Sequence, residues 1–302
     1  MRTALLCELD QLPSDICISV IGFEIENMPN SIFKTDLFEN KVALITGGGT
    51  GIGLRIAREL GQLGAKVIIA SRKMEKLEAG LDILKSEGAD AIAVQCNIRE
   101  EESIKACVAE CVEKFGRIDL LINNGGGQFP SPAEMINRKG WHAVLETNLT
   151  GTFFLTQEVY NSSMSKNGGS VVNVLMDNRN GFPMMAHSAA ARAGVENLTK
   201  TLANEWGRSG VRINSVLPGT IDSSGLKSYA PEFQEMVRGY GKNNQAYRLG
   251  TEAEVAAAVV FLCSPGASFI TGVSLPVDGG QSLYNPLFPP VDNENNPPFG
   301  ED

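Results

Sequence analysis

The stretch Thr46-Gly-Gly-Gly-Thr-Gly-Ile-Gly53 decides the fold class of this chain. It follows the apolar run Lys41-Val-Ala-Leu-Ile-Thr46, which is typical of a buried parallel strand, and it opens a segment at 51–63 in which apolar residues recur at helical spacing. Glycines in such a turn let backbone N–H groups approach a pyrophosphate, and the helix N-terminus adds partial positive charge. Strand, glycine-rich turn and helix in this order therefore predict a dinucleotide-binding site.

Strands and helices alternate through the middle of the chain. Short apolar runs predict further strands at 66–70, 91–95, 119–123, 170–174, 212–216 and 273–277, and helical spacing predicts helices at 74–84, 100–115, 141–146, 151–162, 189–206 and 252–263. With right-handed crossovers, this alternation predicts an α/β fold, a single-domain Rossmann-type doubly wound parallel sheet.

The two ends of the chain differ from this middle part. Residues 1–36 lack sustained periodicity and are predicted to be an N-terminal extension, while residues 37–282 are predicted to form the domain. Residues 283–302 are rich in proline and asparagine, which predicts an extended C-terminal tail.

Composition argues against several classes of protein. The 302 residues include 26 Lys plus Arg and 35 Asp plus Glu, a formal net charge of −9, with no basic stripe to neutralise nucleic-acid phosphates. No apolar run approaches the roughly 18–20 residues of a membrane helix. The six cysteines form no CxxC pair, so no metal site is predicted. The acidic start lacks an apolar signal region and the C-terminus is no peroxisomal address, so we expect a cytoplasmic protein.

The end of the second predicted strand indicates which dinucleotide binds. An acidic residue there would hold the ribose 2′-hydroxyl of NAD, but this chain has Ser71-Arg72-Lys73. Two cations and a hydroxyl suit a 2′-phosphate, so the sequence predicts NADP(H). The alternative is that these residues are the solvated start of a helix.

Two later strand ends are expected to line the same crevice. Asn97 follows the third strand, where its amide either bonds the adenine edge or caps the helix that starts near Glu100. The run Asn123-Asn-Gly-Gly-Gly127 ends the fourth strand, and close approach of a ligand explains three consecutive glycines better than a generic loop.

Several motifs together resemble the short-chain dehydrogenase/reductase family over residues 37–282. They are the glycine-rich turn, the run at 123–127, Asn148 in Asn-Leu-Thr-Gly, Pro218-Gly219 and Asp278-Gly-Gly280. The resemblance implies nicotinamide hydride transfer and a homotetramer. The residues that it assigns to the cofactor are Gly47, Gly49, Thr50, Gly51, Ile52, Gly53, Ser71, Arg72, Lys73, Asn97, Ile98, Asn124, Gly125, Gly126, Arg192, Pro218, Gly219 and Ile221.

Longer stretches are similar to one part of that family. Residues 96–99, 123–129, 140–151 and 191–195 resemble the peroxisomal trans-2-enoyl-CoA reductases, and the helix at 188–206 is also similar to the 2,4-dienoyl-CoA reductases. The resemblance therefore implies an acyl thioester as the substrate.

The chain departs from the family pattern where ketone chemistry is performed. The family usually has a Ser, a Tyr and a Lys, but Leu175, Ser188 and Arg192 occupy the corresponding positions. Asp177 stands where dienoyl reductases have a catalytic Tyr. A ketone reductase needs a proton donor at the developing alkoxide. Reduction of a C=C bond conjugated to a thioester sends hydride to the β-carbon and requires donors at the enolate oxygen, so losing the Tyr disfavours it less.

Three residues are the catalytic candidates. Arg192 is expected to hold the nicotinamide ribose as the family's Lys does, unless it is a surface or interface residue. Asn148 either donates to the substrate carbonyl or orders a water, or else bonds its own helix backbone at a kink. Ser188 either donates to the thioester oxygen or acts as a helix N-cap. His187 is a less favoured proton shuttle, and the tyrosines of the segment 220–250 are further possible donors.

These observations favour an NADPH-dependent enoyl-thioester reductase. Two alternatives remain open: a reductase of another carbonyl or activated alkene, and a catalytically inactive dinucleotide-binding protein.

Overall fold

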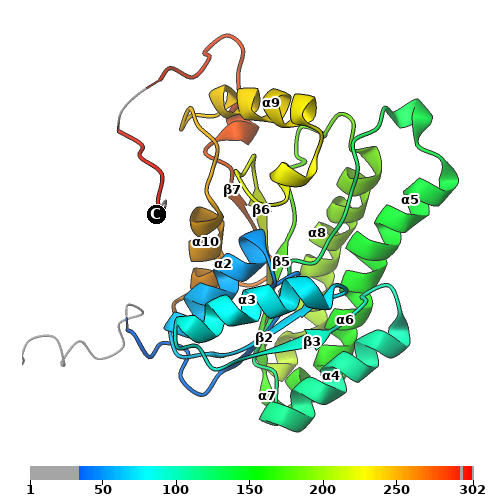
Figure 1. Ribbon diagram of the computed structural model, residues 1–302, viewed down its shortest axis with the longest axis vertical. Coiled ribbons are helices and arrows are strands. Elements are labelled where there is room, and N and C mark those ends of the chain that lie inside the picture. The colour runs from blue at the N-terminus through cyan, green and yellow to red at the C-terminus, as the bar shows by residue number, and fades with distance from the viewer. Residues whose placement is uncertain (1–33, 293–294, 301–302) are drawn as a thin grey trace, which may run out of the picture. The chain divides into compact units, whose positions relative to one another are not determined.

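The computed structural model describes residues 34–292 and 295–300, and these contain one sheet of seven parallel strands (Figure 1). The strands are β1 (Val42–Thr46), β2 (Lys66–Ser71), β3 (Ala91–Gln95), β4 (Leu120–Asn123), β5 (Gly169–Val174), β6 (Val211–Pro218) and β7 (Ser274–Val277). Their order is β3-β2-β1-β4-β5-β6-β7. The predicted Rossmann-type sheet is therefore confirmed, whereas almost all of the predicted extension at 1–36 lies outside the described residues.

Helices cover both faces of the sheet (Figure 1). One face carries α2 (Gly51–Gln62), α3 (Met74–Ser86) and α10 (Glu252–Cys263), and the other carries α4 (Glu101–Phe115), α6 (Gly151–Val159) and α8 (Ala186–Trp206). The remaining α-helices are α5 (Arg138–Leu145), the short α7 (Ser165–Asn167) and α9 (Pro231–Gly239).

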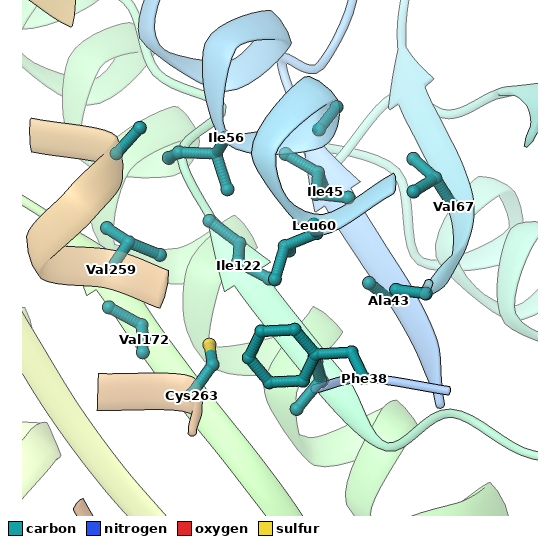
Figure 2. Packing of buried hydrophobic residues seen from close by; sticks show 14 of the residues in the cluster. Phe38, Ala43, Ile45, Ile56, Leu60, Val67, Ile122, Val172, Val259 and Cys263 are labelled. Carbon is teal, nitrogen blue, oxygen red and sulfur yellow. The ribbon is translucent and has the colours of Figure 1, made fainter. Parts of the chain in front are cut away.

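Strand β1 shows how the apolar runs build two cores. Its residues alternate between faces, so Ala43 and Ile45 pack under Ile56 and Leu60 of α2 (Figure 2), while Val42 and Leu44 pack against the opposite helices. Because both faces are covered, every residue of the strand is buried, which explains why the run is continuously apolar.

The two helical stretches predicted at 141–146 and 151–162 belong to one longer helical segment. Alpha-helices α5 and α6 are joined by a π-helical turn at Glu146–Thr150, and a second π-helical turn follows at Tyr160–Met164. A π turn inserts an extra residue and shifts the side chains that follow it, a feature often found at functional sites. The first of these turns holds Asn148.

The change of direction in strand order positions the ligand crevice. Strands β1 and β4 are neighbours although two strands and three helices separate them in sequence, with Leu44 paired to Leu121. Connections leave β1 and β4 toward opposite faces, which opens a crevice at their carboxyl ends. Both glycine-rich segments, at 47–53 and 125–127, follow these two strands.

The described part of the C-terminal tail contacts the domain near its far end. Among the described residues of 284–300 there is no helix or strand. Thr251 Oγ1 donates to the carbonyl of Phe299 at 2.7 Å, and Arg248 Nε donates to the carbonyl of Asn296 at 2.9 Å. The tail is therefore fastened beside the start of α10. Within the described part of the chain, no helix has the length and apolar character needed to cross a membrane.

Candidate active site

The glycine-rich turn forms a cradle of bare backbone. Gly47 and Gly51 have φ values of +65° and +60°, which glycine adopts without strain. A Cβ on Gly53 would collide with the carbonyl oxygen of Gly47, so this position keeps α2 close to the end of β1. The N-cap Thr50 makes no side-chain hydrogen bond, which leaves the first N–H groups of α2 for a ligand. This arrangement fits a pyrophosphate.

The second glycine segment is held directly against the first. Thr46 Oγ1 accepts hydrogen bonds from the N–H groups of Asn124, at 3.0 Å, and Gly125, at 2.8 Å. Asn124 Nδ2 donates to the carbonyl of Thr46 at 3.0 Å. A Cβ on Gly126 would lie 2.7 Å from Asn148 Oδ1. The side chain of Asn124 therefore ties β1 to β4, and its contact with a cofactor stays a prediction.

The end of β2 presents two cations to solvent. Arg72 and Lys73 are exposed, and neither forms an ion pair with a carboxylate among the residues the structure describes. Ser71 Oγ accepts from the N–H of Lys73 at 3.4 Å. Two unpaired cations at the strand end fit the 2′-phosphate of NADP(H).

Asn97 uses its side chain locally. Its Nδ2 donates to Glu100 Oε1 at 2.5 Å, and its Oδ1 accepts from the N–H of Arg99 at 3.3 Å. The N-cap of α4 is Glu100, so Asn97 closes the preceding turn rather than capping the helix. Ile98 is the next residue predicted to line the cofactor site. Its carbonyl oxygen lies so close to Gly151 that a side chain at position 151 would collide with it.

Asn148 is buried in the π-helical turn. Its Nδ2 donates to the carbonyls of Gly127, at 2.7 Å, and Val144, at 2.9 Å, and its Oδ1 accepts from the N–H of Gly127 at 3.2 Å. Both amide protons are therefore used by the backbone, which favours the second of the two predicted roles, that of a kink residue. The amide also fixes the glycine run at 125–127 beside the helix.

Arg192 is the cation of the crevice. It projects from the second turn of α8, and its Nη1 donates to the carbonyl of Val174 at the end of β5, at 3.2 Å. Burial lowers the pKa of its guanidinium to about 10, with the neighbouring Tyr229 acting in the opposite direction, so the group is charged at neutral pH. These bonds within the chain disfavour the surface or interface role considered for Arg192, and its contact with the nicotinamide ribose stays a prediction.

Ser188 is fully buried and does not cap α8. The N-cap is Met185, and Ser188 is the third residue of the helix. The favoured cap prediction was therefore wrong by three positions. Ser188 Oγ instead donates to Gln128 Oε1 at 3.1 Å and accepts from Arg192 Nε at 3.3 Å. Its predicted donation to a thioester oxygen stays a prediction.

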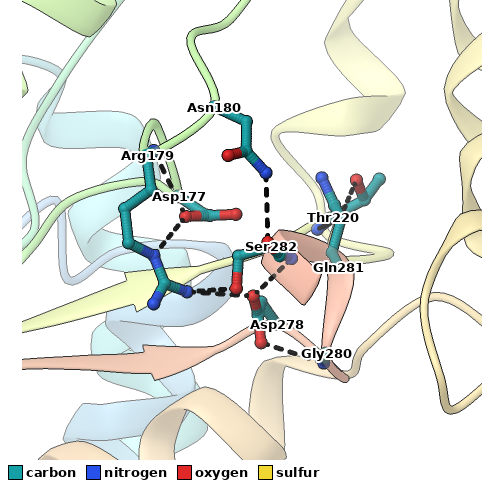
Figure 3. A network of polar contacts seen from close by, with 8 residues as sticks. All are labelled: Asp177, Arg179, Asn180, Thr220, Asp278, Gly280, Gln281 and Ser282. Atoms are coloured by element: carbon teal, nitrogen blue, oxygen red, sulfur yellow. Dashed lines mark hydrogen bonds and ion pairs between the residues drawn. The ribbon is translucent and has the colours of Figure 1, made fainter. Parts of the chain in front are cut away.

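Two further candidates are buried in structural contacts. Burial lowers the pKa of His187, whose Nδ1 accepts from the N–H of Ser188 at 2.8 Å and whose ring packs edge-on against Phe129. Asp177 pairs with Arg179 Nε at 3.0 Å, and Arg179 also binds Asp278 and Ser282 (Figure 3). An Asp committed to an Arg is a poor replacement for the phenol that dienoyl reductases carry at this position.

The Asp-Gly-Gly motif shapes a turn. Burial raises the pKa of Asp278, but hydrogen bonds from Ser282 and from the N–H of Gly280 outweigh it and hold that pKa below its usual value (Figure 3).

The N–H of Gly219, directly after Pro218, donates to the carbonyl of Val277 at 3.0 Å. Ile221 lines a cavity of about 370 Å³ with parts of 244–254 and 276–280. Cofactor contacts of Gly219 and Ile221 stay predictions.

Two further residues complete the hydrogen-bond network of the crevice, and only Gln128 was not assigned a role from the sequence. Gln128 follows the glycine run and accepts from both Ser188 and Arg192, whose Nη2 lies 3.1 Å from Gln128 Oε1. Tyr229, one of the tyrosines in the segment 220–250, accepts from Gln128 Nε2 at 3.3 Å. A polar residue directly after a predicted ligand-contacting glycine run was the available signal for Gln128.

Comparisons with known proteins agree with this geometry. The model of a family described as Enoyl-(Acyl carrier protein) reductase matches residues 47–282. A peroxisomal 2,4-dienoyl-CoA reductase of Danio rerio is 35% identical over 92% of this chain and 93% of its own length. Among solved structures, a citronellol catabolism dehydrogenase of Pseudomonas aeruginosa is 46% identical, with a TM-score of 0.75 over 83% of this chain and 99% of that one. An actinorhodin polyketide ketoreductase solved with NADPH is 32% identical, with a TM-score of 0.76 over 81% of this chain and 98% of that one. The chain therefore belongs to the short-chain dehydrogenase/reductase family.

Proposed function

We propose that this protein is an NADPH-dependent reductase of the C=C bond of a trans-2-enoyl thioester, with an enoyl-CoA or similar acyl carrier as substrate. The observation that carries the proposal is the composition of the crevice. A partly buried cation, Arg192, and neutral donors gather beside the glycine turns, while the family's phenol is replaced by the buried Ser188.

The cofactor is held by backbone and by two cations. The N–H groups at 47–53 would bind the pyrophosphate, and Arg72 and Lys73 would pair with the 2′-phosphate. When bound there, NADPH supplies the hydride. Support comes from the solved ketoreductase, a family member that was crystallised with NADPH.

The chain's own residues stabilise the electron pair that hydride transfer displaces. Addition of hydride at the β-carbon shifts the C=C π pair to the bond between the α-carbon and the carbonyl carbon, and it moves the C=O π pair onto the thioester carbonyl oxygen. Charge developing on that oxygen is best met by preorganised donors in a site with little water. The positive charge of Arg192 lies within such a network. Similarity to 2,4-dienoyl-CoA reductases, which bear an acyl-CoA in their names, supports this substrate class.

A second candidate is oxidation or reduction at an alcohol or aldehyde group of a terpenoid. It is favoured by the 46% identity to the citronellol catabolism dehydrogenase, which exceeds the identity to the dienoyl-CoA reductase of Danio rerio. The missing phenol argues against it, since an alkoxide needs a proton donor of suitable pKa.

The test is direct. Purified full-length protein is incubated with NADPH and either crotonyl-CoA or a longer trans-2-enoyl-CoA, and the loss of NADPH absorbance is followed; citronellol with NADP⁺ and citronellal with NADPH are assayed in parallel. Enoyl-CoA turnover is expected. Turnover of the terpenoids alone supports the second candidate, and NADPH binding without any turnover supports the inactive dinucleotide-binding protein; either result overturns the proposal.

The assembly and location are part of the same proposal. A homotetramer is expected from the family resemblance, and sedimentation of the purified protein measures it. The proposed location is the cytoplasm, although named relatives include peroxisomal enzymes; imaging of the tagged full chain in its own cells decides between the two compartments.

A further inference from the structure

We infer that Tyr229 is the phenol that binds the thioester oxygen, taking over from the segment 220–250 the donor role that the family pattern places at 188 or 177. This inference rests on the proposed function, and it names the donor which that proposal leaves open. It depends on a chain of hydrogen bonds through Gln128, Ser188 and Arg192.

The direction of every bond in this chain is set by Arg192. A guanidinium has donors only, so Ser188 Oγ must accept from Arg192 Nε at 3.3 Å. The single proton of the Ser188 hydroxyl is then free to point to Gln128 Oε1, 3.1 Å away. Gln128 Oε1 also accepts from Arg192 Nη2 at 3.1 Å. Two donors at one atom identify that atom as the amide oxygen, so the amide of Gln128 has one allowed orientation.

That orientation determines what the phenol can do. Gln128 Nε2 faces Tyr229 and donates to its hydroxyl oxygen at 3.3 Å. The phenol therefore accepts from Gln128 and keeps its own proton for another acceptor. Among the residues that the structure describes, the Tyr229 hydroxyl makes no hydrogen bond other than the one from Gln128. Its proton is available to a ligand in the crevice.

Tyr229 is also placed where a substrate can reach it. It is partly exposed and lies between a short 3₁₀ turn at Leu226–Ser228 and α9. Its ring packs against Phe233, with 5.1 Å between the ring centroids, and Gln234 Nε2 donates to its backbone carbonyl at 2.7 Å. Phe233 of α9 thus holds the ring in place, and Gln128 holds the hydroxyl.

The chemical step balances without another reactant. The hydride adds at the β-carbon and brings two electrons. The C=C π pair then forms a new double bond between the α-carbon and the carbonyl carbon, and the π pair of the C=O bond moves to the thioester carbonyl oxygen. The Tyr229 hydroxyl donates a hydrogen bond to that oxygen while it carries the charge. When the C=O bond re-forms, the α-carbon takes up one proton from water, so the net reaction consumes NADPH and one proton.

Removing one hydroxyl tests the assignment. Tyr229→Phe keeps the ring and its packing on Phe233. The matched control, Tyr240→Phe, removes the hydroxyl of a half-exposed tyrosine in the same segment. We expect kcat with crotonyl-CoA to fall about 100-fold or more in Tyr229→Phe and to stay unchanged in Tyr240→Phe, the usual effect of losing one donor at a developing oxyanion. The Kd of NADPH is expected to be unchanged in both. Wild-type kcat in Tyr229→Phe overturns the inference.

A binding experiment gives a readout that does not depend on turnover. In the presence of NADP⁺, the wild type should bind butyryl-CoA more tightly than its thioether analogue S-butyl-CoA, because only the thioester has a carbonyl oxygen. Tyr229→Phe should lose most of that preference, and Tyr240→Phe should keep it. An equal preference in Tyr229→Phe and the wild type contradicts the inference.

Gln128→Glu tests the positioning of the phenol. A carboxylate at 128 still accepts from Ser188 and Arg192 but attracts the Tyr229 proton instead of leaving it free. Its kcat should fall at neutral pH and recover as the pH is lowered and the carboxyl is protonated, a profile that a merely structural Gln128 would not give. If the wild type itself fails to reduce enoyl-CoA, the proposed function fails; if the wild type is active and these variants match it, only the assignment of Tyr229 fails.

Discussion

At position 192 this chain has Arg where the family usually has Lys, and the change adds hydrogen bonds that a Lys does not make. Its fork reaches three partners at once, Ser188, Gln128 and the carbonyl of Val174, which the single ammonium of a Lys cannot reproduce in the same plane. A cation at this position is expected from the resemblance. Its control over the orientation of Gln128 follows only from the structure, because the two residues are 64 positions apart.

Truncating Arg192 separates its charge from its geometry. Arg192→Ala should lower kcat with enoyl-CoA at least 100-fold, because it removes the cation and frees Gln128 to rotate. Arg192→Lys restores the charge but not the fork and should recover only part of the loss. Steady-state kinetics of both variants, with circular dichroism to confirm folding, measure this. Full recovery in Arg192→Lys would show that charge alone matters.

The two cations after β2 set the preference for the cofactor. Arg72→Ala should raise the Kd of NADPH about tenfold, the size of one lost charge-assisted hydrogen bond, and leave the Kd of NADH unchanged. Fluorescence titration with both nucleotides gives the two constants. Arg99→Ala, which removes an exposed cation from the turn after β3, is the control. An equal loss of affinity for both nucleotides in Arg72→Ala would place that side chain away from the 2′-phosphate.

At the scale of elements, sequence patterns predicted what local spacing can encode. The continuous apolar run of β1 predicts a strand covered on both faces, and Val42–Thr46 is entirely buried. Spacing could not show the π-helical turn at Glu146–Thr150, because the extra residue is held there by the contact of Asn148 with Gly127, 21 positions away. Ser188 was misplaced for a related reason. The N-cap of the helix lies three residues before Ser188, and the Ser188 hydroxyl donates to Gln128 in the loop after β4.

The close approach of α2 to β1 gives a prediction for a whole element. A Cβ on Gly53 would meet the backbone oxygen of Gly47, so Gly53→Ala must push α2 away from the glycine turn. We expect the Kd of NADPH to rise beyond the range of titration and the melting temperature to fall. Gly207→Ala is the matched control, because a Cβ there meets nothing within 4 Å. Normal NADPH affinity in Gly53→Ala would show that the turn is not the pyrophosphate site.

At the scale of the whole described unit, residues that are far apart in sequence contact one another at the start of α10. Thr251 and Glu254 form a capping box at the start of this helix, and Glu254 also pairs with Arg248 and accepts from the N–H of Phe299 in the tail. The tail's composition predicts an extended chain rather than packed structure. It could not predict this attachment, because backbone groups make the bonds and any sequence offers them.

Glu254 therefore links helix, loop and tail, and its ionisation should be visible in the stability of the protein. Burial raises its pKa, but the bonds from Arg248, Thr251 and Phe299 outweigh burial and hold the pKa of this carboxyl below its usual value. A carboxyl whose pKa is lower in the folded state stabilises the fold above its unfolded pKa, and that contribution is lost as the pH falls through the folded value. Glu254→Gln keeps a side chain that can complete the capping box but removes the charge paired with Arg248, so it should lower the free energy of unfolding by about 1 kcal/mol near neutral pH. The difference from wild type should shrink below pH 4.5. Urea unfolding at a series of pH values measures it, with the exposed Glu205→Gln as control. If the difference in free energy of unfolding between wild type and Glu254→Gln grew as the pH was lowered, folding would disfavour the ionised form of Glu254. The tail would then be held by other contacts.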